Sequence, residues 1–227
     1  MNVKSYAAAD DTRRRIIESA GEVFAERGFH SATVREITDK AGANIAAIHY
    51  HFRDKVELYA AALRLAHSAA APISSQTGTP KQKLRGFIFS FLRHLLDPSR
   101  PRWHGRLMAR EMTEPTAALD QVVSESIRPR CESLRLIIEE LCARKLTRDE
   151  IALATCSIVG QCLFYLHARP VVERLFPDLR CGPGEIDRLA QHITEFSLPG
   201  VRRLGQPRLT APAASGKRKT LKKKSRS

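Results

Sequence analysis

Apolar residues recur along most of this chain at the three- and four-residue spacing of helices, and the alternation that predicts strands is missing. The first such segment begins near Asp10 or Asp11, either of which can cap a helix, and ends at Gly28. Its apolar side carries Ile16, Ala20, Val23 and Phe24. The pattern therefore predicts an all-α protein that opens with an amphipathic helix.

The segment 33–52 has the strongest local signals. Thr33 and Glu36 have the spacing of a capping box at the start of a helix of about eight residues, which ends at Gly42. Asn44 is a good N-cap for a second short helix that reaches about His51. Two short helices joined by a glycine turn are what insertion into the major groove of DNA requires, although any small helical domain can contain such a pair.

The rest of the chain continues the helical pattern. Asp54 is placed to cap a fourth helix, and the Ser-, Thr-, Gly- and Pro-rich stretch 71–79 predicts a connection. Pro129 is expected to separate two of the later helices, and Thr147 with Glu150 forms another capping box. The later helices are expected over 80–97, 103–113, 117–127, from after Pro129 to about 141, 148–167 and 185–198.

Charge is concentrated at one end of the 227-residue chain. Ten lysines and arginines and no acidic residue lie in 201–227, and removing these ten from the net charge of +14 leaves +4 for the rest. From residue 205 the composition turns to Pro, Ala, Ser, Lys and Arg, which cannot bury a core, so 205–227 is expected to be disordered. This tail is either a solubilising segment or a means of raising non-specific affinity for DNA.

Several classes of protein find no support in the sequence. No run approaches the roughly 18 apolar residues that cross a bilayer, and the N-terminus lacks a signal core, so we expect a cytoplasmic protein without a membrane partner. The five cysteines lack metal-ligand spacing, and His49 and His51 point apart on a helix. No nucleophile elbow, zinc-protease motif or phosphate loop is found. We expect no enzyme, no catalytic residues, no metal and no cofactor.

The residues 12–65 resemble the N-terminal domain of TetR-family regulators. The resemblance rests on A-x-x-x-F-A-E-x-G-F, T-V-R-E-I, A-G-A-N, Y-H-F and K-x-x-L, taken together. The motifs A-G-A-N-I-A-A-I-H-Y-H-F, R-E-M-T-E-P-T and I-V-G-Q-C-L-F-Y-L-H-A-R-P-V are similar to the CecR-type branch. The resemblance implies a helix-turn-helix DNA-binding domain over 10–70, with its motif at 33–52, and a helical domain over 80–204 that binds an effector and dimerises.

The resemblance also implies the residues that touch DNA. Thr33 and Arg35 match positions that contact the DNA backbone. The residues that match groove-facing positions are Asn44, Ile45, Ala46, Ala47 and His49. Those that match phosphate-anchoring positions are Tyr50, His51 and Lys55. The turn Ile45-Ala46-Ala47 has no arginine or glutamine, so two-bond recognition of guanine or adenine is not possible there. Thymine methyl contacts, His49 and DNA shape must supply more of the specificity.

The implied function is that of a sequence-specific regulator of transcription at a palindromic operator, by default a repressor that a small molecule releases from DNA. The expected dimer interface comprises Ile151, Thr155, Ile158, Val159, Cys162, Leu166, Leu189, Ile193 and Phe196. The expected effector pocket comprises Phe87, Phe91, Trp103, Met108, Arg110, Met112, Phe164 and His167, all of which could equally fill a core. The alternatives are a non-specific basic DNA-binding protein and an enzyme.

Overall fold

The computed structural model describes residues 3–68 and 77–206, which are helical with no β-strand among them. The prediction of an all-α fold is confirmed. The α-helices are α1 (Val3–Ser31), α2 (Val34–Ala41), α3 (Ile45–His51), α4 (Lys55–Ser68), α5 (Pro80–Leu96), α6 (Arg102–Thr113), α7 (Ala118–Val122), α8 (Arg128–Glu140), α9 (Arg148–His167), α10 (Arg169–Leu175) and α11 (Ile186–Leu204). Most of the basic tail, and residues 71–76 of the expected connection at 71–79, lie outside the described residues.

Helix α1 is longer than the sequence predicts. It begins before the two aspartates, and Asp11 pairs with Arg14 at 3.3 Å and Arg15 at 3.6 Å on the helix surface instead of capping the first turn. The predicted end at Gly28 is a kink, because this glycine has the non-helical φ of 81°, and the helix then continues to Ser31. The expected start at Asp10 or Asp11 was therefore wrong, and the expected end marks a real change of direction.

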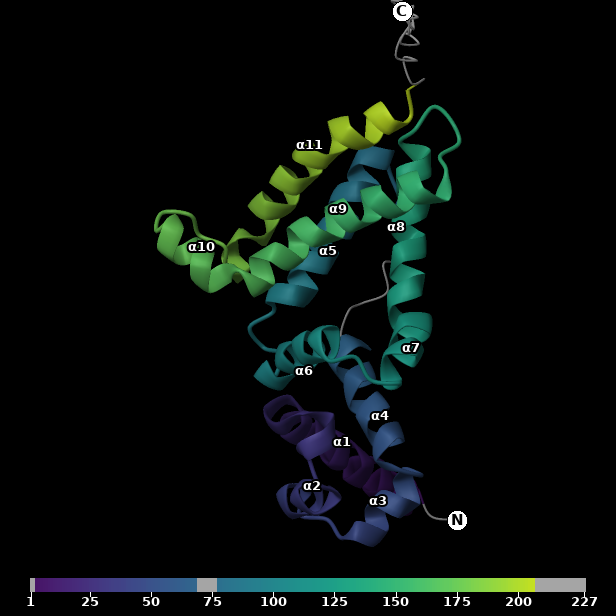
Figure 1. The fold of residues 1–227 in the computed structure, drawn as a ribbon, viewed down its shortest axis with the longest axis vertical. Helices are drawn as coiled ribbons and strands as arrows, with labels where there is room; N and C mark the ends of the chain where they lie inside the picture. The colour runs from purple at the N-terminus through teal and green to yellow at the C-terminus, as the bar shows by residue number, and fades with distance from the viewer. Residues whose placement is uncertain (1–2, 69–76, 207–227) are drawn as a thin grey trace, which may run out of the picture.

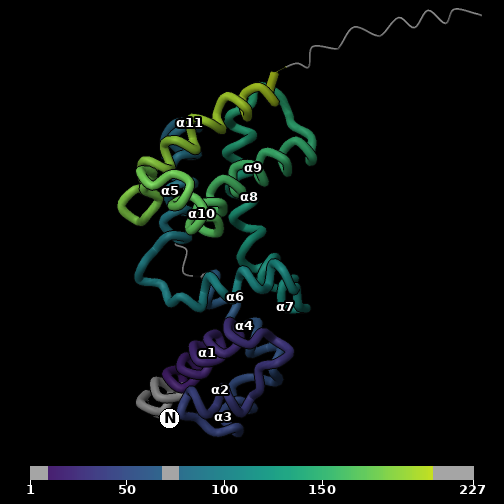
Figure 2. The backbone as a smooth tube through the Cα atoms, turned by 60° about the vertical axis from the view of Figure 1, so that its left-hand side comes forward, coloured from purple at the N-terminus to yellow at the C-terminus, as the bar shows by residue number. Residues whose placement is uncertain are grey.

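Two buried clusters organise the molecule. The first joins α1–α4 with the buried faces of α6 and α7, through Trp103, Leu107, Ala118 and Val122. The second joins α5 with α8–α11. Figures 1 and 2 show α6 and α7 between the α1–α4 bundle at one end and the remaining helices at the other. The predicted boundary near residues 70–80 thus does not coincide with the boundary between the two cores, because the first core contains helices from both sides of it.

Helices α7 and α8 form one continuous rod, although Pro129 was expected to separate them. The residues Val123–Ile127 between them form a π-helical turn, and the Arg128 backbone N–H donates to the Val123 carbonyl. Pro129 falls in the first turn of α8, where a missing backbone N–H costs least. The wider turn therefore carries the helix past a proline that would break a regular one.

The second core is built around α5, which begins with a capping box of Thr79 and Gln82 that was not predicted and packs against α11, α9 and α8. The short helix α10 was not predicted. Helix α11 runs through Pro199 to Leu204, six residues beyond its expected end. Leu198 and Val201, on either side of Pro199, are both buried, and Val201 packs in the second core, which holds the helix across the proline.

Candidate functional site

Helices α2 and α3 have the local structure that the sequence predicts. The Glu36 N–H donates to Thr33 Oγ1 at 3.2 Å, and the Thr33 N–H donates to Glu36 Oε2 at 2.9 Å, which completes the capping box. Gly42 has φ 58°, a left-handed conformation that ends α2 and turns the chain toward α3. The Ala47 N–H donates to Asn44 Oδ1 at 2.8 Å, so Asn44 is the N-cap of α3. These bonds set the angle between the two helices.

One side of α3 is buried and the other faces solvent. Ile48 and Phe52 are each 2% exposed and anchor α3 in the first core, while Ala47 packs at its edge. Ile45 is 49% and Tyr50 is 79% exposed. The remaining outward residues are Ala46 and His49, with Asn44 at the start of the helix. In Figure 1, α2 and α3 lie at the end of the molecule farthest from α11. A short helix with a bare outer side at the end of a packed bundle can enter a groove.

The flanking basic and polar residues fall into two groups. Thr33 and Arg35 are exposed near the start of α2, and His51 is half-buried at the end of α3. Lys55 instead turns toward α1, where its Nζ donates to the His30 carbonyl at 3.3 Å and lies 4.8 Å from the Phe29 ring centre. Burial lowers the pKa of Lys55. The ammonium group therefore ties α4 to the end of α1.

Helix α6 is fitted closely against α1. A Cβ atom built on Gly21 would lie 2.3 Å from Cζ3 of Trp103, and one on Gly28 would lie 2.3 Å from Nη1 of Arg110. Both glycines thus leave room for side chains of α6, and Gly28 is also required by its positive φ. Small residues in α1 therefore let α6 approach this helix closely.

A buried hydrogen bond joins α6 to α4. The hydroxyl of Tyr59, 1% exposed, donates to Glu111 Oε2 at 2.7 Å, and Glu111 is fully buried. The other carboxylate oxygen of Glu111 accepts bonds from the Thr116 N–H at 2.8 Å and the Thr116 hydroxyl at 3.0 Å. Burial and the bond to Glu111 raise the pKa of Tyr59, so the phenol stays protonated and donates. The pair fixes α6 to the helix that follows the helix-turn-helix.

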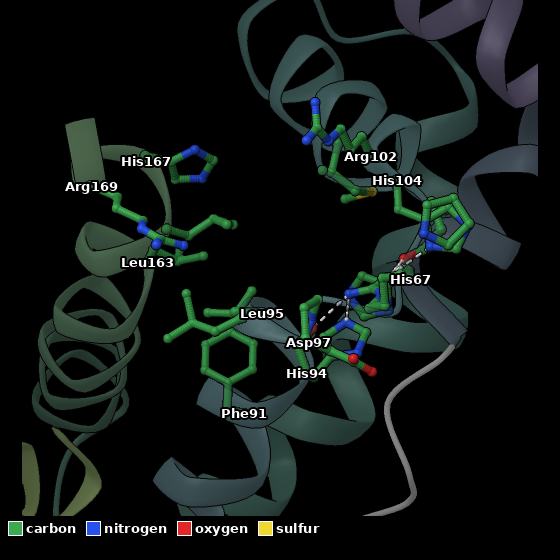
Figure 3. A pocket seen from close by; sticks show the side chains of 18 of the residues that line it. His67, Phe91, His94, Leu95, Asp97, Arg102, His104, Leu163, His167 and Arg169 are labelled. Carbon is green, nitrogen blue, oxygen red and sulfur yellow. Dashed lines mark hydrogen bonds between the residues drawn. The ribbon is translucent and has the colours of Figure 1, made fainter. Parts of the chain in front are cut away.

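A cavity of about 550 Å³ lies where α4, α5, α6, α8 and α9 meet. One part of its wall is apolar and includes Phe91, Leu95, Leu163 and Leu166. Figure 3 shows Phe91, Leu95 and Leu163 on one side of the space and His67, His94 and His104 on the other. A cavity of this size with convergent polar groups is typical of a small-molecule site.

The polar side of the cavity contains an arginine–histidine cluster made of His67, His94, Arg100, His104 and Arg130. The Arg100 guanidinium donates to the His94 carbonyl at 2.8 Å, to the Ala66 carbonyl, and to ring nitrogens of His94 at 3.1 Å and His104 at 3.3 Å. Arg130 donates to the carbonyl of His67 at 3.3 Å and to its Nε2 at 3.4 Å. The Arg100 guanidinium therefore joins the ends of α4 and α5 to the start of α6.

The histidines of this cluster that titrate abnormally are held neutral. Burial, reinforced by the neighbouring Arg130 and Arg100, lowers the pKa of His67 to about 4. Burial and Arg100 lower the pKa of His104 to about 4. Burial also lowers the pKa of Arg100 and of Arg130, which reflects the cost of holding two guanidinium groups away from water.

The expected effector-pocket residues divide into two sets. Phe91, Met108, Met112 and His167 line the cavity. The structure puts the other four elsewhere. Phe87 is buried in the second core and Trp103 in the first. Arg110 faces Gly28 and pairs with Glu114 at 3.8 Å. Phe164 is 55% exposed on the outer side of α9. Helical periodicity had grouped these residues because it cannot tell which neighbouring helix each one meets.

The expected dimer residues also lie in different places. Ile158, Cys162, Leu189 and Ile193 are buried within the chain's own second core, where α9 and α11 pack on α5. The half-buried members Ile151, Thr155, Val159 and Leu166 lie at the edges, and Leu166 also lines the cavity. Phe196, 72% exposed, is the member that faces outward.

Helix α9 has an outer side that is apolar as well. Leu153 is 69% exposed and Phe164 is 55% exposed. Among the described residues, α9 is the helix whose length and composition would allow it to cross a membrane, and 22% of the relevant window is buried. An exposed apolar helix face of this kind is typical of an interaction surface, which either a partner protein or lipid could bury.

Sequence reasoning missed the arginine–histidine cluster. His67 lies near the end of one helix and His94 near the end of another, Arg100 lies between the two prolines of the next turn, and His104 follows in α6. The one signal in the sequence is the density of His and Arg in 93–106, where a surface would be an equally good explanation. Only the packing of four helices brings these side chains together.

Helices α2 and α3 are short and joined by a glycine turn, and the outer side of α3 is exposed to solvent. This arrangement defines a helix-turn-helix DNA-binding regulator of transcription. Residues 16–62 match the family described as bacterial regulatory proteins, tetR family. Residues 80–201, more than half of the chain, match the C-terminal domain of the HTH-type transcriptional dual regulator CecR. The chain belongs to the TetR family, in the branch that carries a CecR-type C-terminal domain.

The relatives agree with this assignment. The HTH-type transcriptional repressor NicS of Pseudomonas putida is 29% identical over 209 residues, which cover 86% of this chain and 94% of NicS. The HTH-type transcriptional activator FasR of Mycolicibacterium smegmatis is 33% identical over 93 residues, 37% of this chain and 42% of FasR, so that match spans less than half of the relative. The transcriptional regulator FadR from Bacillus subtilis has the same fold, with a TM-score of 0.60 at 19% identity over 82% of this chain and 98% of FadR.

These families consist of transcriptional regulators and not of enzymes. Within the described residues, no group of three or more His, Cys, Asp or Glu side chains is arranged to hold a metal ion.

Proposed function

We propose that the protein is a dimeric repressor that binds a palindromic operator through α3 and leaves it when a small molecule enters the cavity. One observation carries the DNA-binding part: Ile48 and Phe52 lock α3 into the first core while Ile45, His49 and Tyr50 stay outside it. A rigid helix with an uncovered outer side loses little conformational entropy when it docks in a groove.

The chemistry of this outer side suggests how it reads a sequence. Ile45 and Ala46 can contact thymine methyl groups, and His49 can hydrogen bond to a base edge. Asn44, Tyr50 and the residues around the start of α2 supply amide, hydroxyl and guanidinium donors suited to phosphates. We therefore expect T-rich half-sites in which DNA shape adds to the specificity.

Selection of bound genomic fragments followed by footprinting tests the DNA-binding proposal. We expect a protected palindrome, and His49→Ala to weaken binding to it by about tenfold, because a lost base contact costs roughly 1–3 kcal/mol. The matched control is Lys145→Ala, at an exposed position in the α8–α9 connection, which should leave operator affinity unchanged. Uniform coating of DNA without a preferred site would reject the proposal in favour of a non-specific DNA-binding protein.

The outer sides of α9 and α11 are the proposed dimer interface. Leu153 and Phe164 on α9, and Phe196 on α11, expose more than half of their surface. A two-fold copy packed on this side would cover them and pair two recognition helices, and paired half-sites multiply discrimination. Light scattering should show a dimer that Leu153→Glu with Phe196→Glu converts to a monomer. Leu175→Glu, at a 65% exposed position on α10, is the control and should stay dimeric. A wild-type monomer would refute this interface.

The small-molecule part of the proposal rests on the cavity. It is large enough for a ligand, and it touches α4, the helix that follows the helix-turn-helix. The FadR structure contains stearoyl-CoA, so this fold can hold a small molecule. We propose that the protein works in the cytoplasm, where its operator lies, and that the tail 205–227 raises non-specific DNA affinity. Deletion of 217–227 should then flatten the salt dependence of non-specific binding.

A further inference from the structure

The cavity has two chemically different ends. Phe91, Leu95, Leu163 and Leu166 form the apolar end, near α9. The arginine–histidine cluster forms the opposite end, at the junction of α4, α5, α6 and α8, as Figure 3 shows for its labelled histidines. A ligand that fills such a space has one polar end and one apolar end.

The lining as a whole carries an excess of positive charge, although Figure 3 shows one of its arginines, Arg169, beside Leu163 and away from the cluster. The lining contains four arginines, Arg100, Arg102, Arg130 and Arg169, against one acidic residue, Asp97. Asp97 Oδ1 accepts bonds from the Ser99 N–H at 2.9 Å and the Ser99 hydroxyl at 2.7 Å. Arg169 already pairs with Glu173 at 2.7 Å. Asp97 therefore offsets part of the charge of Arg100 without forming an ion pair with it, and the cluster keeps a net positive charge.

Arg100 and Arg130 lack a carboxylate partner. Within 3–68 and 77–206, no Asp or Glu oxygen lies within 4.0 Å of either guanidinium, and the buried Nε of Arg100 has no hydrogen-bond acceptor. Their hydrogen-bond partners are backbone carbonyls and imidazole rings. Partly buried positive charges without a carboxylate partner are costly, and an anion that reached them would gain strong charge-assisted bonds.

We propose that the effector is a small amphipathic anion, with its anionic head on Arg100 and Arg130 and its apolar body against Phe91 and Leu163. This inference rests on the proposed function and names the chemical class that the cavity takes. A carboxylate and a phosphate ester share the chemistry of the head. A guanidinium can grip either with two parallel N–H bonds.

The same two arginines also hold the end of α4. Arg100 donates to the Ala66 carbonyl and Arg130 to the His67 carbonyl, and both carbonyls belong to the last turn of α4. Carbonyls at a helix end lack partners within the helix, so these bonds are part of what fixes that end. An anionic head competes for the same N–H groups. Its binding therefore loosens the last turn of α4, and α4 leads directly from the helix-turn-helix.

Fluorescence titration of the full chain tests the ligand class without DNA. Trp103 is the only tryptophan, and its ring lies 4.1 Å from that of His104, which lines the cavity. The probes are decanoate and decyl phosphate as anions, decanol as the neutral analogue and decyltrimethylammonium as the cation. We expect saturable binding of at least one anion, at least about tenfold tighter than decanol, because a charge-assisted bond adds more than a neutral one. Decanol or the cation binding as tightly as both anions, or no saturable binding of either anion, would overturn the proposal.

Variants assign the binding to the two arginines. Arg100→Gln and Arg130→Gln should each weaken anion binding about tenfold and leave decanol binding unchanged. Arg106→Gln is the matched control, since Arg106 is exposed on α6 and does not line the cavity. Thermal unfolding shows whether each variant is folded, and the comparison of wild-type probes stands without any variant. Equal anion affinity in the folded Arg100→Gln and Arg130→Gln variants would refute the assignment.

Hydrogen exchange tests the link to α4. Decanoate should speed exchange of the backbone amides in 62–68 of the wild type, and decanol should not. Unchanged exchange in the anion-bound protein would show that the arginines keep their carbonyl contacts, and would overturn the competition. None of these measurements uses an operator, so their failure is separate from a failure to find a DNA site.

Discussion

The contact between Gly21 and Trp103 predicts an unusual response to a small substitution. A Cβ atom on Gly21 would lie 2.3 Å from Cζ3 and 2.5 Å from Cε3 and Cη2 of the indole. Trp103 is only 6% exposed and is packed in the first core, so its ring can move only if its neighbours move as well. Gly21→Ala should therefore strain the joint between α1 and α6.

Two opposing contributions decide the magnitude. Alanine in place of glycine in a helix interior stabilises by about 1 kcal/mol. Overpacking a filled site costs about 1–3 kcal/mol. The control is Gly105→Ala on α6, where a new Cβ would meet no atom within 4 Å and only the helical gain applies. Gly21→Ala should thus be about 1–3 kcal/mol less stable than Gly105→Ala, a gap in Tm of roughly 2–12 °C for a chain of this size.

Thermal unfolding at one fixed protein concentration measures this gap, since dimerisation would make Tm depend on concentration. In a Trp103→Leu background, which lacks the three clashing carbons, Gly21→Ala should stabilise as Gly105→Ala does. Equal Tm values for the two alanine variants, or additive effects of Gly21→Ala and Trp103→Leu, would refute the close fit of α6 on α1.

Three further predictions test other parts of the structure. Tyr59→Phe should lower the free energy of unfolding by roughly 1–3 kcal/mol, measured by urea denaturation, because the buried Glu111 carboxylate loses a donor; an unchanged midpoint would contradict this. The pKa of His67 is about 4 in the folded state against an ordinary 6.5, so protons favour unfolding, and Tm should fall as the pH drops from about 6.5 toward 4. In His67→Gln, Tm should fall less steeply over this pH range than in the wild type, and an equal dependence of Tm on pH in the two proteins would refute the prediction. Asn44→Asp keeps the oxygen that caps α3, so the free energy of unfolding should stay within about 0.5 kcal/mol of the wild-type value. Gel-shift affinity for DNA should nevertheless fall, because the new charge faces phosphates; unchanged affinity would place Asn44 away from the duplex.

The sequence predicts local structure well where a few neighbouring residues decide it. The predicted capping boxes at Thr33 and Thr147, the N-cap Asn44 and the turn at Gly42 are all present in the structure. Each depends on hydrogen bonds between residues three or four positions apart, which the order of residues specifies directly.

Features that depend on distant residues were not predictable in the same way. Phe87 and Trp103 have the residue types of a pocket wall, but packing buries them in two different cores. Arg100 and Arg130 look like surface residues, and only the meeting of α4, α5, α6 and α8 buries them in part. The course of the chain past Pro129 depends on a π-helical turn that no local propensity indicates.

The shared core of α1–α4 with α6 and α7 bears on how this family could be recombined. A hybrid regulator joined between residues 68 and 77 would set Gly21 and Tyr59 of one parent against an unrelated α6 from the other. The buried tyrosine would then lack its acceptor, and the space beside the glycine would be empty or overfilled. The exchangeable module is therefore discontinuous: 3–68 should be transplanted together with 102–127, and new specificity for effectors grafted around them.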